Sequence, residues 1–227
     1  MTSEATDWVS QSCTLPTAEQ PLRIAEFDDL FATGLLGLER LTPGATYMFV
    51  SNHQSHYDTP VVFSSLPYQL RIIAKESLGK FPVLGWHLKR SGHLFVDRQQ
   101  PDRVGIVRRW KELVSEGTSL IIFAEGTRSS DGRVARFKAG SFLLALEAGL
   151  TIVPLSISGS INVMRKGGLT TRPGRVRLTV HPPIAPTKIA SPSVTDARDL
   201  ARRIEEIVRT GVLSAERGFE GSEHPAH

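Results

Sequence analysis

The sequence predicts an α/β fold, a single domain in which a mixed central sheet of about six or seven strands is covered by helices. Short apolar runs rich in β-forming residues alternate along the chain with segments of helical periodicity. Several of these runs end directly in polar or charged residues, as buried strands do at the edge of a sheet. The length of 227 residues allows one sizeable core and leaves no room for a second domain.

The first strand is expected at Tyr47–Ser51, where an apolar run follows turn residues at 42–44. The preceding segment 22–41 is semi-apolar and is interrupted by Gly34 and Gly37. The chain then alternates between helix and strand. In order, we expect an apolar helix around Val61–Phe63, a strand at Leu70–Ala74, a short helix at Phe81–Lys89 and a strand at Gly92–Arg98.

A cover helix is expected at Val104–Glu116, because apolar residues recur there at helical intervals and Gly117 stops the pattern. The elements after it are a strand at Leu120–Ala124, a buried helix at Ser141–Ala148, and strands at Thr151–Ile157 and Arg175–Val180. Residues 196–212 carry one apolar stripe and predict a final helix, with Thr195 as its N-cap. We expect residues 22–213 to form the folded domain, between a polar lead at 1–21 and a disordered tail at 214–227.

The composition restricts partners and compartment. A net charge of +4 and a pI of about 9.5 favour anionic partners, but the many acidic residues argue against a nucleic-acid partner. The single cysteine, Cys13, excludes an internal disulfide and is compatible with a reducing, intracellular compartment. We find neither a run of about 18 apolar residues nor a signal peptide, so we expect no transmembrane helix and no secretion.

A possible base and its orienting group follow the first expected strand along the chain. His53 follows that strand and Asp58 comes five residues later, at the start of the next helix. On a regular helix this spacing separates two side chains by about 140°, so the pair meets only if the strand ends at His53 and Asp58 lies in the first helical turn. A histidine held in this way accepts a proton near neutral pH, because the carboxylate fixes its tautomer and stabilises the imidazolium.

Other interpretations of this motif stay open at this stage. A histidine satisfied by a nearby carboxylate is common in protein cores, and His56 is an alternative base. The three residues His53, His56 and Asp58 could also form part of a metal site. We expect no metal, because the chain has no cysteine cluster and the remaining histidines that could supply a remote ligand are scattered, at His87, His93 and His181.

A glycine-containing turn, Glu125-Gly126-Thr127-Arg128, follows the strand expected at Leu120–Ala124. Backbone amides, a hydroxyl and a guanidinium can converge in such a turn, and arginine matches a phosphate with two parallel hydrogen bonds. Two more cations, Lys75 and Arg98, end other expected strands and could occupy the same rim. The sequence therefore predicts a phosphate site at the carboxyl ends of the strands.

Four ordered blocks of the chain are similar to those of a known family. The blocks are Asn52-His53-x4-Asp58, Gly92–Arg98, Phe123–Ser129 and Ile152–Ile157. They resemble the glycerolipid acyltransferases, in particular the 1-acylglycerol-3-phosphate (lysophosphatidate) acyltransferase family. The likeness covers roughly Gly37–Pro183 and does not extend to either end of the chain.

The resemblance implies transfer of a fatty acyl group from acyl-CoA or acyl-carrier protein to the sn-2 hydroxyl of 1-acyl-sn-glycerol 3-phosphate, with no further cofactor. His53 would be the general base and Asp58 its orienter. Arg98 and the turn from Glu125 through Gly126 and Thr127 to Arg128 would bind the phosphate of the acceptor, with Lys75 as a weaker candidate. Another lysophospholipid acceptor and a non-catalytic phospholipid-binding domain are the alternatives.

The chain differs from the family in one respect that concerns the membrane. Family members usually carry a membrane-embedded segment ahead of the first block, and no long apolar run precedes Gly37 here. We therefore expect a cytoplasmic protein bound peripherally to an anionic membrane surface. The candidate contacts are the semi-apolar segment 30–36 and the basic residues Lys80, Lys89, Arg90, Arg108, Arg109 and Lys111.

Overall fold

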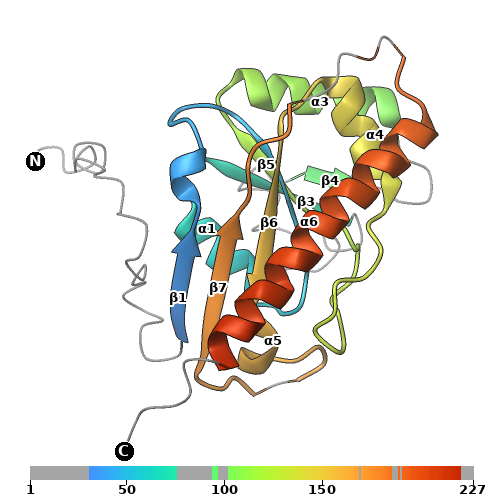
Figure 1. The fold of residues 1–227 in the computed structure, drawn as a ribbon. Helices are drawn as coiled ribbons and strands as arrows, with labels where there is room; N and C mark the ends of the chain where they lie inside the picture. The colour runs from blue at the N-terminus through green and yellow to red at the C-terminus, as the bar shows by residue number, and fades with distance from the viewer. Residues whose placement is uncertain are drawn as a thin grey trace, which may run out of the picture.

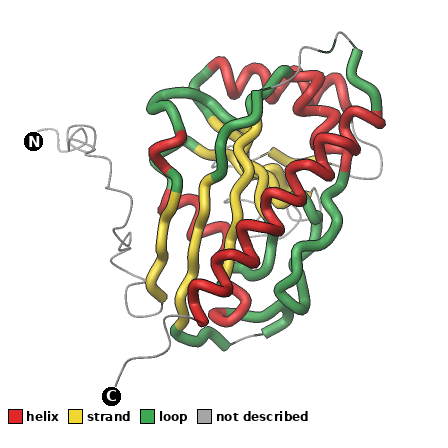
Figure 2. Tube along the Cα trace, in the orientation of Figure 1, coloured by secondary structure: helices red, strands yellow, loops and turns green. Residues whose placement is uncertain are grey.

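The computed structural model describes residues 31–75, 94–96, 102–168, 170–185, 189 and 191–220. These residues form a seven-stranded sheet with helices on both of its faces (Figures 1 and 2). The elements in chain order are β1 (Phe31–Leu36), η1 (Leu38–Arg40), β2 (Met48–Ser51), α1 (Asp58–Ser65), β3 (Leu70–Lys75), β4 (Leu94–Val96), α3 (Arg103–Ser115), β5 (Ser119–Phe123), α4 (Ala139–Ala148), β6 (Ile152–Ser158), α5 (Ser160–Val163), β7 (Gly174–Val180) and α6 (Val194–Glu220).

The strand order is β1-β7-β6-β2-β5-β3-β4, and the sheet is mixed. Strands β6, β2, β5, β3 and β4 run parallel to one another. Strand β7 is antiparallel to β6, and β1 pairs in parallel with β7 at the sheet edge. The predicted α/β fold with a mixed sheet is confirmed. The carboxyl ends of the five parallel strands meet at one edge, where open α/β sheets bind their ligands.

The sheet separates two apolar cores, because successive side chains of a strand point to opposite faces. On one face, Met48 and Val50 of β2 pack with α3, α4 and α6, and all of these form one buried cluster. On the other face, Phe49 joins a second cluster with α1, η1 and the odd-numbered positions of β6. The central strands are thus buried on both sides, which explains their nearly unbroken apolar sequences.

The long helix α6 crosses the sheet diagonally in Figure 1 and packs against β6. Its apolar stripe supplies Ala197, Ala201, Ile204, Val208 and Val212 to the first core. Polar contacts fix its second half: the Ser156 hydroxyl donates to the carbonyl of Val208 at 2.9 Å and lies 2.7 Å from Nε2 of His181. Burial lowers the pKa of His181 to about 4, with a further contribution from the charge of Arg40, so the imidazole is neutral in this contact.

The structure corrects three expectations. The semi-apolar segment before Leu38 contains β1, an edge strand. Its own sequence did not reveal it, because the strand is defined by its pairing with β7. Helix α6 begins at Val194 with Ser193 in a capping box with Asp196, so Thr195 is not the N-cap. The same helix continues to Glu220, so residues 214–220, which we expected in a disordered tail, are helical.

The remaining expected elements lie near their predicted bounds, except for the helix at Phe81–Lys89, which falls outside the described residues. None of the described helices is both long and apolar enough to span a bilayer.

Candidate active site

His53 and Asp58 meet at the carboxyl edge of the sheet, as the sequence predicts. Strand β2 ends at Ser51 and α1 begins at Asp58, so the two side chains lie on either side of a short strand-to-helix junction. Nδ1 of His53 lies 2.7 Å from Oδ2 of Asp58. A carboxylate accepts hydrogen bonds, so Nδ1 is the donor in this contact, and in the neutral ring the lone pair then lies on Nε2. The His53 side chain is 19% exposed and that of Asp58 is fully buried.

Asp58 is held by three donors besides the imidazole. The backbone amides of Gln54 and Ser55 donate to Oδ2 at 2.6 and 2.9 Å, and the hydroxyl of Ser160 donates to Oδ1 at 2.5 Å. These hydrogen bonds offset the free-energy cost of removing the carboxylate from water. Ser160 opens the short helix α5 behind β6, and sequence reasoning missed it because it lies 102 residues away along the chain.

The residues around His53 fix the direction of its ring. Asn52 exchanges two hydrogen bonds with the backbone of Ile157, at 2.9 and 2.8 Å, and so extends the pairing of β2 with β6 up to the histidine. Phe123, the last residue of β5, stacks on the imidazole with ring centroids 4.1 Å apart. The ring is therefore confined between an aromatic face and the Asp58 carboxylate, with Nε2 as its available nitrogen.

Glu125 supports the site from the neighbouring strand. Its side chain is buried, and its two carboxylate oxygens accept from the amides of His53 at 2.8 Å and Ala135 at 3.2 Å. Burial raises the pKa of Glu125 to about 7, although the two amide bonds act in the opposite direction. The carboxylate faces inward and holds the backbone of His53, so both of its oxygens already have donors, and its expected contact with a phosphate stays a prediction.

The rest of the predicted phosphate turn contacts the backbone of His53. Gly126 adopts a left-handed conformation with φ of 74°, which lets the chain reverse directly after β5. The amide of Ser129 donates to the carbonyl of His53 at 2.7 Å, so the turn is bonded to the backbone of His53. Thr127 is exposed and its hydroxyl accepts from Nζ of Lys166 at 3.2 Å. Lys166 is a cation at this rim that we did not predict.

Arg128 is half-buried, and its Nη1 atom is buried without a hydrogen-bond partner among the described residues. A buried guanidinium nitrogen normally has a partner, so this donor is suited to an anionic ligand. The charge of Arg128 also contributes to lowering the pKa of the exposed His56, after burial and ahead of His53, while Asp58 acts in the opposite direction. Arg128, His56 and His53 are therefore close enough to influence one another electrostatically.

Of the two further predicted cations, the structure describes only the backbone of Lys75. The backbone of Lys75 ends β3 and pairs with Val96 of β4, at the same carboxyl edge as His53. Arg98 lies outside the described residues. His181, one of the remote histidines considered for a metal, is instead bonded to Ser156 beneath α6. The described residues contain no group of three or more side chains arranged to hold a metal ion.

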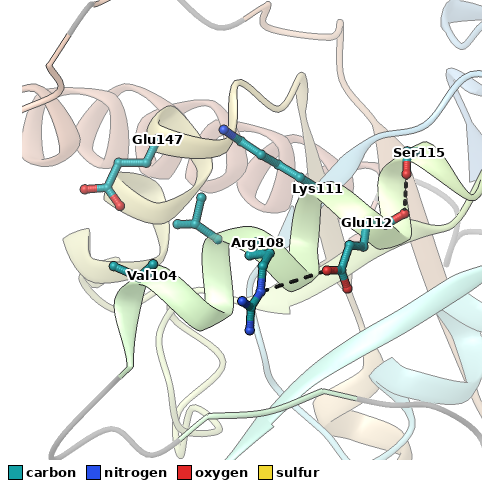
Figure 3. A pocket seen from close by; sticks show the side chains of 7 residues that line it. Val104, Arg108, Lys111, Glu112, Ser115 and Glu147 are labelled. Carbon is teal, nitrogen blue, oxygen red and sulfur yellow. Dashed lines mark hydrogen bonds and ion pairs between the residues drawn. The ribbon is translucent and has the colours of Figure 1, made fainter.

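A hollow of small-molecule size lies away from these residues, on the surface of α3 beside the end of α4. It has a volume of about 880 Å³, lies between α3 and α4, and none of the site residues named above lines it (Figure 3). Its lining combines exposed charges with the apolar residues Val104 and Val107, and Arg108 forms a surface ion pair with Glu112. Size alone therefore does not locate the chemistry, which depends on the convergent polar groups at the sheet edge.

Comparison with known proteins agrees with this geometry. Residues 6–158 match the sequence model of the Acyltransferase family. The chain is 36% identical over 162 residues to a chloroplastic 1-acyl-sn-glycerol-3-phosphate acyltransferase of Brassica napus, covering 70% of this chain and 46% of the relative. It is 30% identical to the alpha form of the same enzyme from Mus musculus over 73% of this chain and 59% of the relative, and thus spans about half the length of such curated relatives.

A solved structure supports the same assignment. The crystal structure of the 1-acyl-sn-glycerophosphate acyltransferase PlsC from Thermotoga maritima superimposes with a TM-score of 0.68 at 29% identity, covering 86% of this chain and 74% of that one. The family match extends over more than half of the chain and includes the junction that carries His53 and Asp58. The chain belongs to the acyltransferase family.

Proposed function

We propose that this protein transfers a fatty acyl group from a thioester to the sn-2 hydroxyl of 1-acyl-sn-glycerol 3-phosphate. The observation that carries the proposal is the His53–Asp58 pair, in which Nε2 is the available nitrogen of a half-buried and oriented imidazole. The printed activity of the relatives supports the choice of acceptor. The unpartnered nitrogen of Arg128 beside the base supports an acceptor that carries a phosphate.

The chemistry requires only a base and correct orientation, because a thioester is already activated. Nε2 of His53 removes the proton of the acceptor hydroxyl while the alcohol oxygen attacks the thioester carbonyl. The carbon–sulfur bond then breaks, the acyl group remains on the alcohol oxygen, and the thiolate takes the proton from the imidazolium. Asp58 stabilises the imidazolium during this sequence, and no covalent intermediate with the protein is needed.

Replacing the base tests this assignment. His53→Ala should reduce acyl transfer to labelled 1-acyl-sn-glycerol 3-phosphate by about 10²–10⁴-fold, the contribution of a general base. His56→Ala is the matched control, since this histidine is exposed and lies three residues further on. We expect that control to retain most of its turnover, and circular dichroism to show both variants folded. A folded His53→Ala protein with near-normal turnover would refute the proposal.

Arg128 is proposed to bind the acceptor phosphate. Arg128→Ala should raise the acceptor KM on the order of 10- to 100-fold, because a charge-assisted hydrogen bond to a phosphate is lost. Arg133→Ala is the matched control: its side chain is 90% exposed and lies in the same loop, where it pairs with Asp131. Steady-state kinetics at saturating donor distinguish the two. Equal acceptor KM values for the wild type and Arg128→Ala would show that the phosphate binds elsewhere.

We further propose that the protein works while bound peripherally to an anionic membrane surface, since its acceptor is a membrane lipid. The segment 30–36, our first candidate for this contact, is largely taken up by β1. The better candidate is α3, where Val104 is 81% exposed and the exposed cations Arg108, Arg109 and Lys111 follow on the same helix.

Flotation with vesicles tests this contact. The wild-type chain should float with vesicles that contain anionic lipid at low salt and should dissociate as salt screens the cations. Val104→Asp should reduce the bound fraction, and Leu213→Asp, a change at an exposed residue of α6, should not. A wild-type chain that remains unbound at low salt contradicts peripheral attachment, and equal binding by both variants excludes α3 as the contact.

A further inference from the structure

Another hollow, lined by basic residues, lies between the start of α4 and the first half of α6. Its volume is about 640 Å³. We call it the α4–α6 groove, and its lining residues are Arg136, Phe137, Lys138, Ala139, Arg198, Ala201 and Arg202. Four of these are cations and none is acidic. Helix α4 begins in the groove and carries no acidic residue in its first turn. The groove therefore concentrates positive charge around an apolar floor.

The ion pairs around the groove leave most of its positive charge available. Arg202 is paired with Asp199 on the surface of α6. Within the part of the chain that the structure describes, no acidic side chain forms an ion pair with Arg136, Lys138 or Arg198. Glu205, one turn beyond the groove, is already engaged by the amide of Phe137 and by Arg209.

The backbone connects the groove to the candidate active site. The amide of Lys138 donates to the carbonyl of Ala124 at 3.0 Å, which fixes the start of α4 at the carboxyl end of β5. Ala135, next to the groove residue Arg136, donates to the Glu125 carboxylate, whose other oxygen accepts from the amide of His53. Two short backbone connections therefore link the groove to the strand ends that hold His53 and Glu125.

We propose that the α4–α6 groove binds the phosphorylated nucleotide of a coenzyme A thioester, the donor in the proposed function on which this inference rests. The volume falls within the range of small-molecule sites, about 300–1,000 Å³, which favours a nucleotide over the flat surface of a carrier protein. Arginine side chains bind phosphate groups and also stack on planar rings. The nucleotide would stay at the flank while the flexible pantetheine arm carries the thioester to His53.

This assignment separates two anion sites by function. Arg128 holds the phosphate of the acceptor beside the base, and the groove holds the phosphates of the donor. Changes in the groove should therefore alter donor recognition and leave acceptor recognition unchanged. The difference between donors with and without a nucleotide isolates this effect, because both deliver the same acyl group to the same base.

The decisive experiment compares two donors. The double variant Arg136→Ala/Arg198→Ala should raise the acyl-CoA KM on the order of 10-fold without changing the acceptor KM. The preference for acyl-CoA over the matching acyl-pantetheine, measured as a ratio of kcat/KM values, should fall by a similar factor. Arg217→Ala, which removes an exposed arginine at the other end of α6, is the control and should keep the wild-type preference. An unchanged preference in the double variant overturns the proposal.

A binding measurement keeps this proposal separate from the proposed function. Adenosine 3′,5′-bisphosphate, titrated calorimetrically, should bind the wild type and Arg217→Ala and should bind the double variant on the order of 10-fold more weakly. If the wild type binds this probe but transfers no acyl group, the proposed function fails while the groove assignment stands. If the wild type transfers acyl groups but the double variant loses activity only with an acyl-carrier protein donor, the groove recognises a protein and the assignment is wrong.

Discussion

The site depends on one buried carboxylate. Asp58 has no exposed surface, yet it accepts four hydrogen bonds, from the His53 ring, two backbone amides and the Ser160 hydroxyl. Such a group is costly to bury without partners, and each lost donor removes part of the compensation for burying the charge. The junction after β2, the start of α1 and the start of α5 must therefore assemble together. The same contacts that satisfy Asp58 determine which nitrogen of His53 is available.

A second carboxylate performs the corresponding task for the backbone. Glu125 receives the amide of His53 on one oxygen and that of Ala135 on the other. It joins the ends of β2 and β5 and holds the following turn, which returns to His53 through the amide of Ser129. Burial and hydrogen bonding oppose one another at this group, and burial prevails in raising its pKa to about 7. The two acidic residues thus hold the ring and the backbone of His53 from two sides.

The sequence was sufficient for the parts of this arrangement that depend on local spacing. His53 and Asp58 could be paired because a strand-to-helix junction is readable from an apolar run followed by a helix start. Ser160 could not, because its contact with Asp58 depends on how β6 lies beside β2. The inward direction of Glu125 was missed for the same reason, since a turn sequence does not show which of its side chains face the protein.

The differences in the fold have similar physical causes. Strand β1 contains threonine and glycine and exists through its pairing with β7, about 140 residues later, so no local pattern marked it. Helix α6 was predicted to end where its apolar stripe thins, but Ala215 is still buried and the helix continues. Small buried residues carry a weak hydrophobic signal, and tertiary contacts decide the boundary.

The central claim is that Asp58 fixes the tautomer of His53, so that the lone pair of the neutral ring lies on Nε2. Nitrogen-15 NMR of the histidine ring measures this directly, because protonated and unprotonated ring nitrogens have well-separated chemical shifts. With the His53 signals assigned by comparison with His53→Ala, the account predicts a protonated Nδ1 and an unprotonated Nε2 in the resting protein at alkaline pH. The opposite tautomer, with the proton on Nε2, would leave no base facing the substrate and would contradict it.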